Sequence, residues 1–435
     1  MTSMERRIFI LTSGASAIQT QRAAGANDRV NVAVVGTRSR GRDHIDIYAR
    51  QQGVAVAAVC DIDNAQAERA VALVEKAAAP KPRAYQDFRK LLEDKSVDAV
   101  SLATCDHWHA LGAIWACQAG KDVYVEKPAS HNLWEGRKMI EAAAKYGRVM
   151  QVGMQSRSID HKQKAIELLR QGAIGRVYLA KGICYKRRKS IGQCPDGPIP
   201  AGVDFSQWLG PAPMRPFNPY RFHDNWHWFW DTGNGDIANQ GVHEMDIARW
   251  GLGKQHLPAK ITSSGGKYAC DDDRETPNTQ LSTFDYEDCQ LVFEVRGLLT
   301  GGEGLIPYDG TNFIGNLFFG SEGFLSVDST GFQLYLGEKR EISQSMQATE
   351  PHIWDTAPHM ANFIECVRTR KMENLRGPIE DGHLSAALCH LANISYRLGR
   401  QLKFDPKQEN CGADYEANQL LSRNYRAPYV VPETV

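Results

Sequence analysis

Short β-branched runs alternate with segments of helical spacing through the first third of the chain. Val30–Val35 has the character of a buried parallel strand, and Gly36 ends it. The expected strands are 30–35, 54–59, 97–104, 123–125 and 149–152, and the expected helices are 43–52, 64–78, 85–93, 109–119 and 133–146. This cadence predicts a parallel sheet with helices on both faces, and right-handed crossovers would make it doubly wound.

The cadence changes beyond about residue 160. Residues 186–220 are rich in proline and glycine, which predicts a long loop. The expected strands are 177–185, 259–263, 280–284, 289–296, 312–319 and 323–327, and helical spacing marks 166–171, 360–369 and 382–398. The second half therefore predicts an α/β domain with a large, mostly antiparallel open sheet, and its last helix could fold back onto the first domain.

The length of 435 residues exceeds what one compact core accommodates, so we expect two domains. The predicted division is a leader at 1–28, a first domain with the parallel sheet at 29–155, a second domain at 156–406, and a tail at 407–435. Hydrophobic residues make up 42% and the formal net charge is zero, without a long run of one sign. A nucleic-acid or acidic-membrane partner has no electrostatic support.

The N-terminus resembles a twin-arginine export signal. Arg6 and Arg7 precede the modest apolar run 8–18. This route carries folded proteins, which suits a protein that loads its nucleotide before export to the periplasm. The alternative is a cytoplasmic tail, and beyond this region we expect no membrane span.

The ten cysteines are scattered without a CxxC pair, which predicts buried, reduced thiols rather than disulfides or a zinc site. Several histidines cluster near expected strand and helix ends, but HExxH or comparable ligand spacing is absent. We therefore expect no metal centre.

An incomplete nucleotide-binding signature follows the first strand. In a G-x-G-x-x-G pattern, Gly36 and Gly41 take the first and third positions and Arg38 takes the second, with Arg40 beside it. Asp61 ends the next strand, where a carboxylate can accept both ribose hydroxyls and would repel a 2′-phosphate. The pattern favours NAD, the two arginines keep NADP as a lesser option, and an ordinary turn with a solvated aspartate is the alternative.

Two further segments carry the candidate chemistry. Lys127, in Glu126-Lys127-Pro128, follows a strand and can stabilise a developing alkoxide. If residues 236–250 form one helix, Asp236, Asn239 and His243 share a stripe, and His243 is a candidate general base. A surface lysine and a satisfied core histidine are the alternatives, but the two signals coexist with the nucleotide signature.

The remaining candidates surround these residues. Thr104, His107 and His109 follow the third strand and are expected to line the nicotinamide pocket, with Glu126 among the cofactor contacts. The aromatic segment 220–230 can pack on sugar C–H faces, although a domain-interface cluster explains it equally well. The candidate substrate-binding residues are Gln155, Arg157, His223, Trp226, Trp228, Trp230, Asp236 and His243.

From Val30 to about Pro406 the chain resembles the Gfo/Idh/MocA oxidoreductases. The likeness is carried by the 104–109 turn, by Glu126-Lys127-Pro128 and by the segment from Gly241 to Asp246. The resemblance implies a Rossmann domain, a C-terminal α/β domain whose open sheet often mediates oligomers, and hydride transfer to or from sugars or cyclitols with a tightly held NAD(P). It assigns the catalytic lysine and histidine to Lys127 and His243.

Two departures from the family pattern matter. Arg38 replaces the middle glycine, and Asn239 stands where the family often has aspartate four residues before the histidine. An amide can orient His243 but cannot share its proton, which leaves Asp236 or Asp246 to supply the charge. The chain combines an arginine-containing turn, an aromatic loop and the leader. In this combination it resembles an exported, carbohydrate-processing branch of the family.

Three functions are weighed from the sequence. The first is an NAD-dependent dehydrogenase acting on a ring hydroxyl of a sugar or glycoside, at C3 in one version, as a homodimer or homotetramer. The second is a redox glycosidase that oxidises C3 transiently and eliminates the aglycone, for which a tyrosine or histidine of the aromatic loop could take the C2 proton. The third is a non-catalytic nucleotide-binding sensor, against which Lys127 and His243 both argue.

Overall fold

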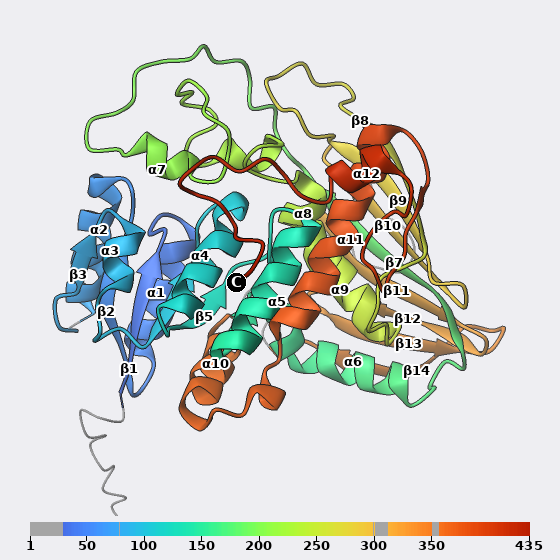
Figure 1. Cartoon of the computed structure of the whole chain (residues 1–435). Helices are drawn as coiled ribbons and strands as arrows, with labels where there is room; N and C mark the ends of the chain where they lie inside the picture. Colours follow the sequence, from blue (N-terminus) through green and yellow to red (C-terminus); the bar gives the residue numbers. More distant parts are fainter. Residues whose placement is uncertain (1–28, 78, 299, 301–311, 350–355) are drawn as a thin grey trace, which may run out of the picture.

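The structure is a computed structural model that describes residues 29–77, 79–298, 300, 312–349 and 356–435. Two sheets lie on opposite sides of a helical layer (Figure 1). The first sheet contains β1 (Val30–Val35), β2 (Val54–Cys60), β3 (Arg83–Tyr85), β4 (Ala99–Leu102), β5 (Asp122–Val125) and β6 (Met150–Val152). Its helices are α1 (Arg40–Arg50), α2 (Asn64–Lys76), α3 (Phe88–Leu92), α4 (Asp106–Gln118) and α5 (Leu133–Tyr146).

The first sheet has the order β3-β2-β1-β4-β5-β6, and all its strand pairs are parallel. The predicted doubly wound Rossmann architecture is therefore confirmed. The strand order reverses between β1 and β4, and ligands of such sheets bind outside the carboxyl ends of the strands at this point.

Both glycines of the first turn are required by close packing. Gly36 has φ +77°, and a Cβ there would lie 2.7 Å from the Ala103 carbonyl oxygen. A Cβ on Gly41 would lie 1.9 Å from the Gly36 carbonyl oxygen. The first glycine thus permits the tight turn, and the third lets α1 pack onto it.

The second sheet has nine strands in the order β14-β13-β12-β11-β7-β10-β9-β8-β15. They are β7 (Val177–Lys186), β8 (Lys260–Gly266), β9 (Thr279–Asp285), β10 (Gln290–Arg296), β11 (Asn312–Gly320), β12 (Gly323–Val327), β13 (Gly331–Leu336), β14 (Glu341–Gln347) and β15 (Leu402–Lys403). Only β7 and β10 pair in parallel, so the sheet is mostly antiparallel as predicted.

The other helices connect the two sheets. They are α6 (Asp160–Arg170), α7 (Phe205–Leu209), α8 (Asp236–Asn239), α9 (Gly241–Gly251), α10 (Ala357–Thr369), α11 (Ile379–Leu398) and α12 (Tyr415–Gln419), with short 3₁₀ turns η2 (Gln155–Ser158), η3 (Asn225–Trp228) and η4 (Met372–Asn374). Helix α11 runs beside α5 (Figure 1) and packs against β6, where Gly382 faces Val152. The last long helix therefore does fold back onto the first domain.

Some expectations about individual elements were wrong. The helix expected at 85–93 is present but shorter, as α3 after strand β3, and the loop expected at 186–220 contains α7. Strand β14 was not predicted because it is an exposed edge strand with the polar sequence EISQSMQ. Strand β13 was also missed, although Phe332 and Leu334 alternate with outward residues along it. Helix α10, assigned to the second domain, packs in the Rossmann core.

The predicted leader at 1–28 lies outside the described residues. Over the rest of the chain that the structure describes, we find no helix with the length and apolar character that a bilayer crossing needs. All ten cysteines are described and none forms a disulfide. The 407–435 tail ends against the Rossmann helices, where Tyr429 packs on Trp108 and Trp115 of α4.

Candidate active site

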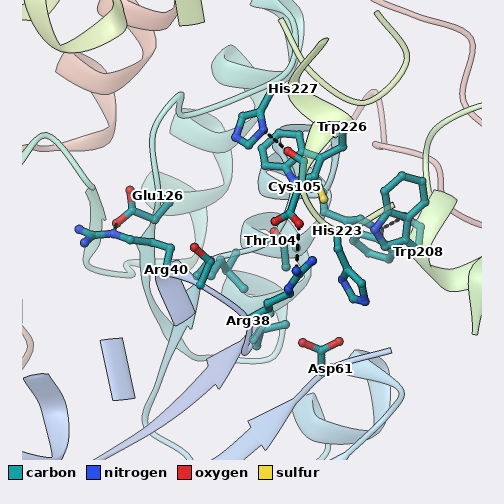
Figure 2. Close-up of a pocket in the computed structure, with 18 of the residues that line it drawn as sticks. Arg38, Arg40, Asp61, Thr104, Cys105, Glu126, Trp208, His223, Trp226 and His227 are labelled. Carbon is teal, nitrogen blue, oxygen red and sulfur yellow. Dashed lines mark hydrogen bonds and ion pairs between the residues drawn. The ribbon is translucent and has the colours of Figure 1, made fainter. Parts of the chain in front are cut away.

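A cavity of about 570 Å³ lies at the carboxyl ends of the Rossmann strands and extends toward the second sheet. Predicted site residues that line it are Gly36, Arg38, Arg40, Asp61, Thr104, Glu126, Lys127, Gln155, His223, Trp226, Asn239 and His243. Figure 2 shows Asp61 and Arg38 at one end and Trp226 and His227 further along the same space. The structure thus brings the nucleotide signature and the candidate catalytic residues to one cavity.

Asp61 is buried at the end of β2 and is held by the first turn. Its Oδ2 accepts hydrogen bonds from the Thr37 amide at 2.7 Å and the Thr37 hydroxyl at 3.1 Å, and its Oδ1 accepts one from the Asp63 amide at 3.0 Å. Burial raises the pKa of Asp61, and these donors oppose the rise. Across the cavity, the buried Thr104 hydroxyl has no hydrogen-bond partner among the described residues. A polyol with hydroxyls at this end would find both an acceptor and a free hydroxyl.

Two side-chain contacts connect the aromatic segment 220–230 to the loops that follow β1 and β2. The Arg38 guanidinium pairs with Asp224 at 2.9 Å (Figure 2), and His223 Nε2 lies 3.0 Å from Asp63 Oδ2. Asp63 lies two residues after Asp61, in the loop that follows β2. The segment around η3 therefore forms one wall over the turn that follows β1.

Glu126 organises the middle of the cavity. Its Oε1 accepts hydrogen bonds from Arg40 Nε at 2.9 Å and Gln155 Nε2 at 3.0 Å, and it lies 3.0 Å from His44 Nε2. Burial alone would raise the pKa of Glu126, but Arg40, His44 and Lys127 hold it well below its usual value. Arg40, expected to contact the cofactor, is thus already paired with a carboxylate.

Lys127 projects from the end of β5 toward α8. Its ammonium donates to the Asn239 backbone carbonyl and, at 3.4 Å, to the Asn239 side-chain oxygen. Burial lowers the pKa of Lys127, while Glu126 and Asp106 oppose that change. Asn239, which was expected to orient His243, instead holds the lysine.

Asp106 was missed by the sequence analysis, although it lies within the 104–109 turn. It occupies the first turn of α4 and is buried. Burial raises the pKa of Asp106 to about 8, and the positive charge of Lys127 opposes the rise. A buried carboxyl whose proton is coupled to Lys127 therefore lies behind the cavity wall.

The single helix expected at 236–250 is interrupted. Helix α8 ends at Asn239 and α9 begins at Gly241, with Gln240 between them. The shared stripe of Asp236, Asn239 and His243 was therefore wrong. Asp236 lies outside the cavity lining and pairs with Arg188 at 2.6 Å.

His243 is buried on α9 at the cavity wall, with 2% of its surface exposed. Burial, reinforced by the charge of Lys127, lowers the pKa of His243 well below the usual value. The imidazole is therefore neutral at neutral pH and has the protonation state that a general base needs.

Arg157 and Asp246 belong to a buried ion network rather than to the cavity. Arg157 donates two hydrogen bonds of 2.8 Å to Asp246 and one of 2.8 Å to Asp381. Arg249 also donates to Asp381, at 2.7 Å. These contacts occupy the Arg157 guanidinium, so Arg157 is poorly placed for substrate. The charge of Asp246 opposes the lowering of the His243 pKa, but only as a minor influence.

The aromatic residues separate into two groups. Trp226 lines the cavity, as do Trp208 and His227, which the sequence analysis did not select. The His227 ring stacks on Trp226 with centroids 3.6 Å apart, and its Nδ1 donates to the Asp224 carbonyl at 2.9 Å. Trp228 and Trp230 lie outside this cavity. Trp208 could not be selected from sequence, because a single tryptophan within the predicted 186–220 loop forms no recognisable functional motif.

Three residues that were expected to contact the cofactor do not line the cavity but lie beneath the residues that do. His107 contacts the Thr232 and Trp208 carbonyls at 3.2 and 2.9 Å, and His109 contacts the Pro128 carbonyl at 2.7 Å. Gly41 packs beneath the turn. These residues position the lining, and a direct contact with cofactor stays a prediction.

The buried histidines predict a loss of stability in acid. Burial lowers the pKa of His107, His227 and His390 to about 3 and that of His359 to about 4. In the unfolded chain these groups titrate near 6.5, so the unfolded state binds more protons below that pH. The free energy of unfolding should therefore fall as pH drops from about 6.5 toward 4.

Urea unfolding at pH 7, 6 and 5 measures this effect. The buried carboxyls Asp106 and Glu244, with pKa values raised to about 8 and about 7, act in the opposite direction but are outnumbered. The His359→Gln variant should show a shallower dependence, since it removes one titrating group. A free energy of unfolding that stays level or rises toward pH 5 would contradict the assignment of neutral buried imidazoles.

Comparisons with known proteins agree with this geometry. A glycosyl hydrolase family 109 protein of Stenotrophomonas maltophilia is 33% identical over 221 residues, which cover 47% of this chain and 48% of that protein. Inositol 2-dehydrogenase 2 of Saccharopolyspora erythraea is 28% identical over 305 residues, covering 68% and 77% of the two chains. This chain thus spans about half the length of the first of these curated relatives.

The WlbA dehydrogenase of Bordetella pertussis, solved with NADH and UDP-GlcNAcA, shares the fold with a TM-score of 0.64 at 19% identity, over 87% of this chain and 99% of that one. Residues 30–154 match the oxidoreductase family with an NAD-binding Rossmann fold, and residues 183–298 and 320–431 match its C-terminal α/β domain. Because the two matches take in both sheets and both candidate catalytic residues, the chain belongs to the Gfo/Idh/MocA oxidoreductase family.

Proposed function

We propose that this protein is an NAD-dependent oxidoreductase that transfers a hydride between a ring hydroxyl of a sugar or glycoside and a tightly held nicotinamide. The observation that carries the proposal is the single cavity that joins Asp61 and the Gly36 turn to Lys127 and His243. The Thr104 hydroxyl, which has no partner among the described residues, and the tight turn at Gly36 fit a dinucleotide there. When bound, the nicotinamide supplies the hydride acceptor.

The chain's own residues supply the rest of the reaction. Lys127 holds the reacting oxygen and stabilises its developing negative charge, which a buried ammonium does more effectively than a solvated one. His243, neutral because of burial, takes the hydroxyl proton. The indole faces of Trp208 and Trp226 pack on the sugar ring, and Gln155 is fixed by Glu126 at the same wall.

The lining favours NAD over NADP. Asp61 offers a carboxylate where the adenosine ribose is expected, and it would repel a 2′-phosphate. Both arginines that could bind such a phosphate are paired with carboxylates, Arg38 with Asp224 and Arg40 with Glu126.

The Asp61→Asn variant tests this preference. We expect the Kd for NAD to rise about 10- to 10²-fold, because a charge-assisted hydrogen bond contributes about 1.5–3 kcal/mol, and we expect the Kd for NADP to rise less or to fall. Fluorescence titration of nucleotide-free protein gives both constants. The exposed Asp46→Asn variant on α1 is the matched control, and an equal rise for both nucleotides would show that Asp61 only supports the turn.

The direct experiment is to denature the purified protein, identify the released nucleotide, and screen sugars and glycosides for a change at the absorbance band of reduced nicotinamide. Release of NAD or NADH, with reduction by at least one carbohydrate, supports the proposal. A protein that takes up no nicotinamide nucleotide when it is supplied in excess would overturn it.

A redox glycosidase is the second candidate, and His227 favours it. Its Nδ1 donates to a backbone carbonyl, which leaves Nε2 as an unprotonated nitrogen at the cavity wall. Burial lowers the pKa of His227 to about 3. A neutral imidazole nitrogen at this wall can take the proton beside a transient ketone, although the lowered pKa makes it a weak base. Aglycone release without net NADH formation, lost in His227→Gln, would distinguish this candidate from the dehydrogenase.

We also propose export by the twin-arginine route and assembly as a homo-oligomer. Support for export comes from Arg6 and Arg7, and support for assembly comes from the open nine-stranded sheet. Fractionation of cells producing the wild-type chain and an Arg6→Lys/Arg7→Lys variant tests the first, and light scattering of the purified protein tests the second. Retention of both chains in the cytoplasm, or a monomeric mass, would contradict them.

A further inference from the structure

A second cavity, of about 330 Å³, lies apart from the candidate active site. It is enclosed by α11, by the end of the aromatic segment and by the chain that follows α12, which crosses over α11 and α5 (Figure 1). No residue lines both cavities. Its volume is at the lower end of the roughly 300–1,000 Å³ that ligand pockets occupy, so it suits a ligand of one ring.

The floor of the second cavity is polar, neutral and buried. Asn393 donates to the Asn234 carbonyl at 2.9 Å, and Asn234 donates to the His131 carbonyl at 3.2 Å, which fixes the floor. The His390 side chain is 4% exposed, and its Nδ1 has no hydrogen-bond partner among the described residues. A buried polar atom without a partner costs free energy, and a ligand hydroxyl would satisfy it.

The rim carries an aromatic face and two guanidinium groups. Arg397 Cζ lies over the Trp230 ring, 5.2 Å from its centroid. Arg423 donates to the Asp231 carbonyl at 2.9 Å and lies 3.2 Å from His131 Nδ1. Neither of these partners carries a negative charge that would neutralise Arg423.

Nearby carboxylates act on these two arginines only from beyond ion-pair distance, Asp231 and Glu275 on Arg397 and Glu135 on Arg423. Asp231 is the only acidic residue in the lining, and its carboxylate pairs with Arg215 at 2.5 Å. Within the described chain, neither Arg397 nor Arg423 has a carboxylate at ion-pair distance. The rim therefore presents two guanidinium groups without a directly bonded carboxylate, beside an indole and above a floor of amides and neutral imidazoles.

We propose that this second cavity binds a monosaccharide-sized sugar acid, with its carboxylate on Arg397 and Arg423 and its ring against Trp230. Arginine guanidinium groups match a carboxylate with paired donors, and an indole packs on the C–H face of a sugar. The hydroxyls then reach His390 and the amides of the floor. The inference does not depend on hydride transfer, because it concerns a surface that shares no lining residue with the first cavity.

The test is isothermal titration of the full chain with D-glucuronate and D-galacturonate, compared with D-glucose, D-galactose and acetate. We expect saturable binding of a uronate, and binding at least tenfold weaker for the neutral sugars and for acetate. In Arg397→Gln and Trp230→Leu the uronate affinity should fall about tenfold. The exposed Arg69→Gln variant on α2 serves as the matched control and should bind as the wild type does.

A comparison of two variants separates this site from the active site. Lys127→Ala should leave uronate binding unchanged, and Arg397→Gln should leave NAD binding unchanged. Arg397 extends from the exposed side of α11, so its replacement leaves the core intact. Uronate binding that disappears in Lys127→Ala but survives in Arg397→Gln, equal affinity for acetate, or no saturable uronate binding would each overturn the proposal.

Discussion

Replacing Lys127 with alanine is expected to lower kcat by about 10²–10³-fold, the usual cost of removing one preorganised donor to a developing negative charge. Its ammonium lies partly buried at the cavity wall and is already oriented by Asn239. Because the contribution is made mainly in the transition state, kcat and kcat/KM should fall together. Steady-state formation of reduced nicotinamide, with the sugar identified in the screen, measures the effect.

The control separates catalysis from structure. Lys127 also links β5 to α8, so the Lys127→Ala variant must keep its Tm and its Kd for NAD. Lys138→Ala, at the partly buried Lys138–Glu141 ion pair on α5 and outside the cavity lining, should leave kcat unchanged. A Lys127→Ala enzyme that is folded, binds NAD and turns over at the wild-type rate would favour the non-catalytic sensor.

Replacing His243 with asparagine should lower kcat by about 10²–10⁴-fold, the range for loss of a general base. The pH profile provides a second readout. Since burial and Lys127 hold the pKa of His243 well below 6.5, the wild-type imidazole stays neutral as pH falls from 7 toward 5.5, and its ionisation should not reduce the rate over that interval. In His243→Asn, hydroxide must take the proton, so the residual rate should rise with pH.

The exposed His256→Gln variant, outside the cavity, should behave as the wild type does. If His243→Asn kept the wild-type kcat and pH profile, the histidine would be a core residue without a catalytic role. If the His243→Asn variant lost activity only because it was less stable, kcat would recover at a lower temperature, which would show that His243 has a structural role.

Much of the fold follows from local sequence pattern. Runs such as Val30–Val35 are buried on both sides, and the glycine that ends this run is demanded by the approach of Ala103. Where a strand had no buried face, as in β14, the pattern lost its alternation and the strand was missed. Hydrophobic periodicity arises because one face of an element is buried, so an element without a buried face is not predicted from it.

The sequence was sufficient to select most of the individual site residues, but not to predict which of them contact one another. Lys127, His243 and Asp61 were selected from motifs, and all three line one cavity. The break at Gln240, which turns Asn239 toward Lys127, depends on packing between distant segments. In the same way, Arg157 was expected to bind substrate because no local signal shows that Asp246 and Asp381 occupy its guanidinium.

The most direct test of the account is a crystal structure of the protein with bound NAD. The account predicts that the adenosine ribose meets Asp61 and that nicotinamide C4 faces a space bounded by Lys127 Nζ and the His243 imidazole, where a hydroxyl carbon would lie about 3–3.5 Å from C4. A nicotinamide ring directed away from these two side chains, or a nucleotide bound outside this cavity, would contradict it.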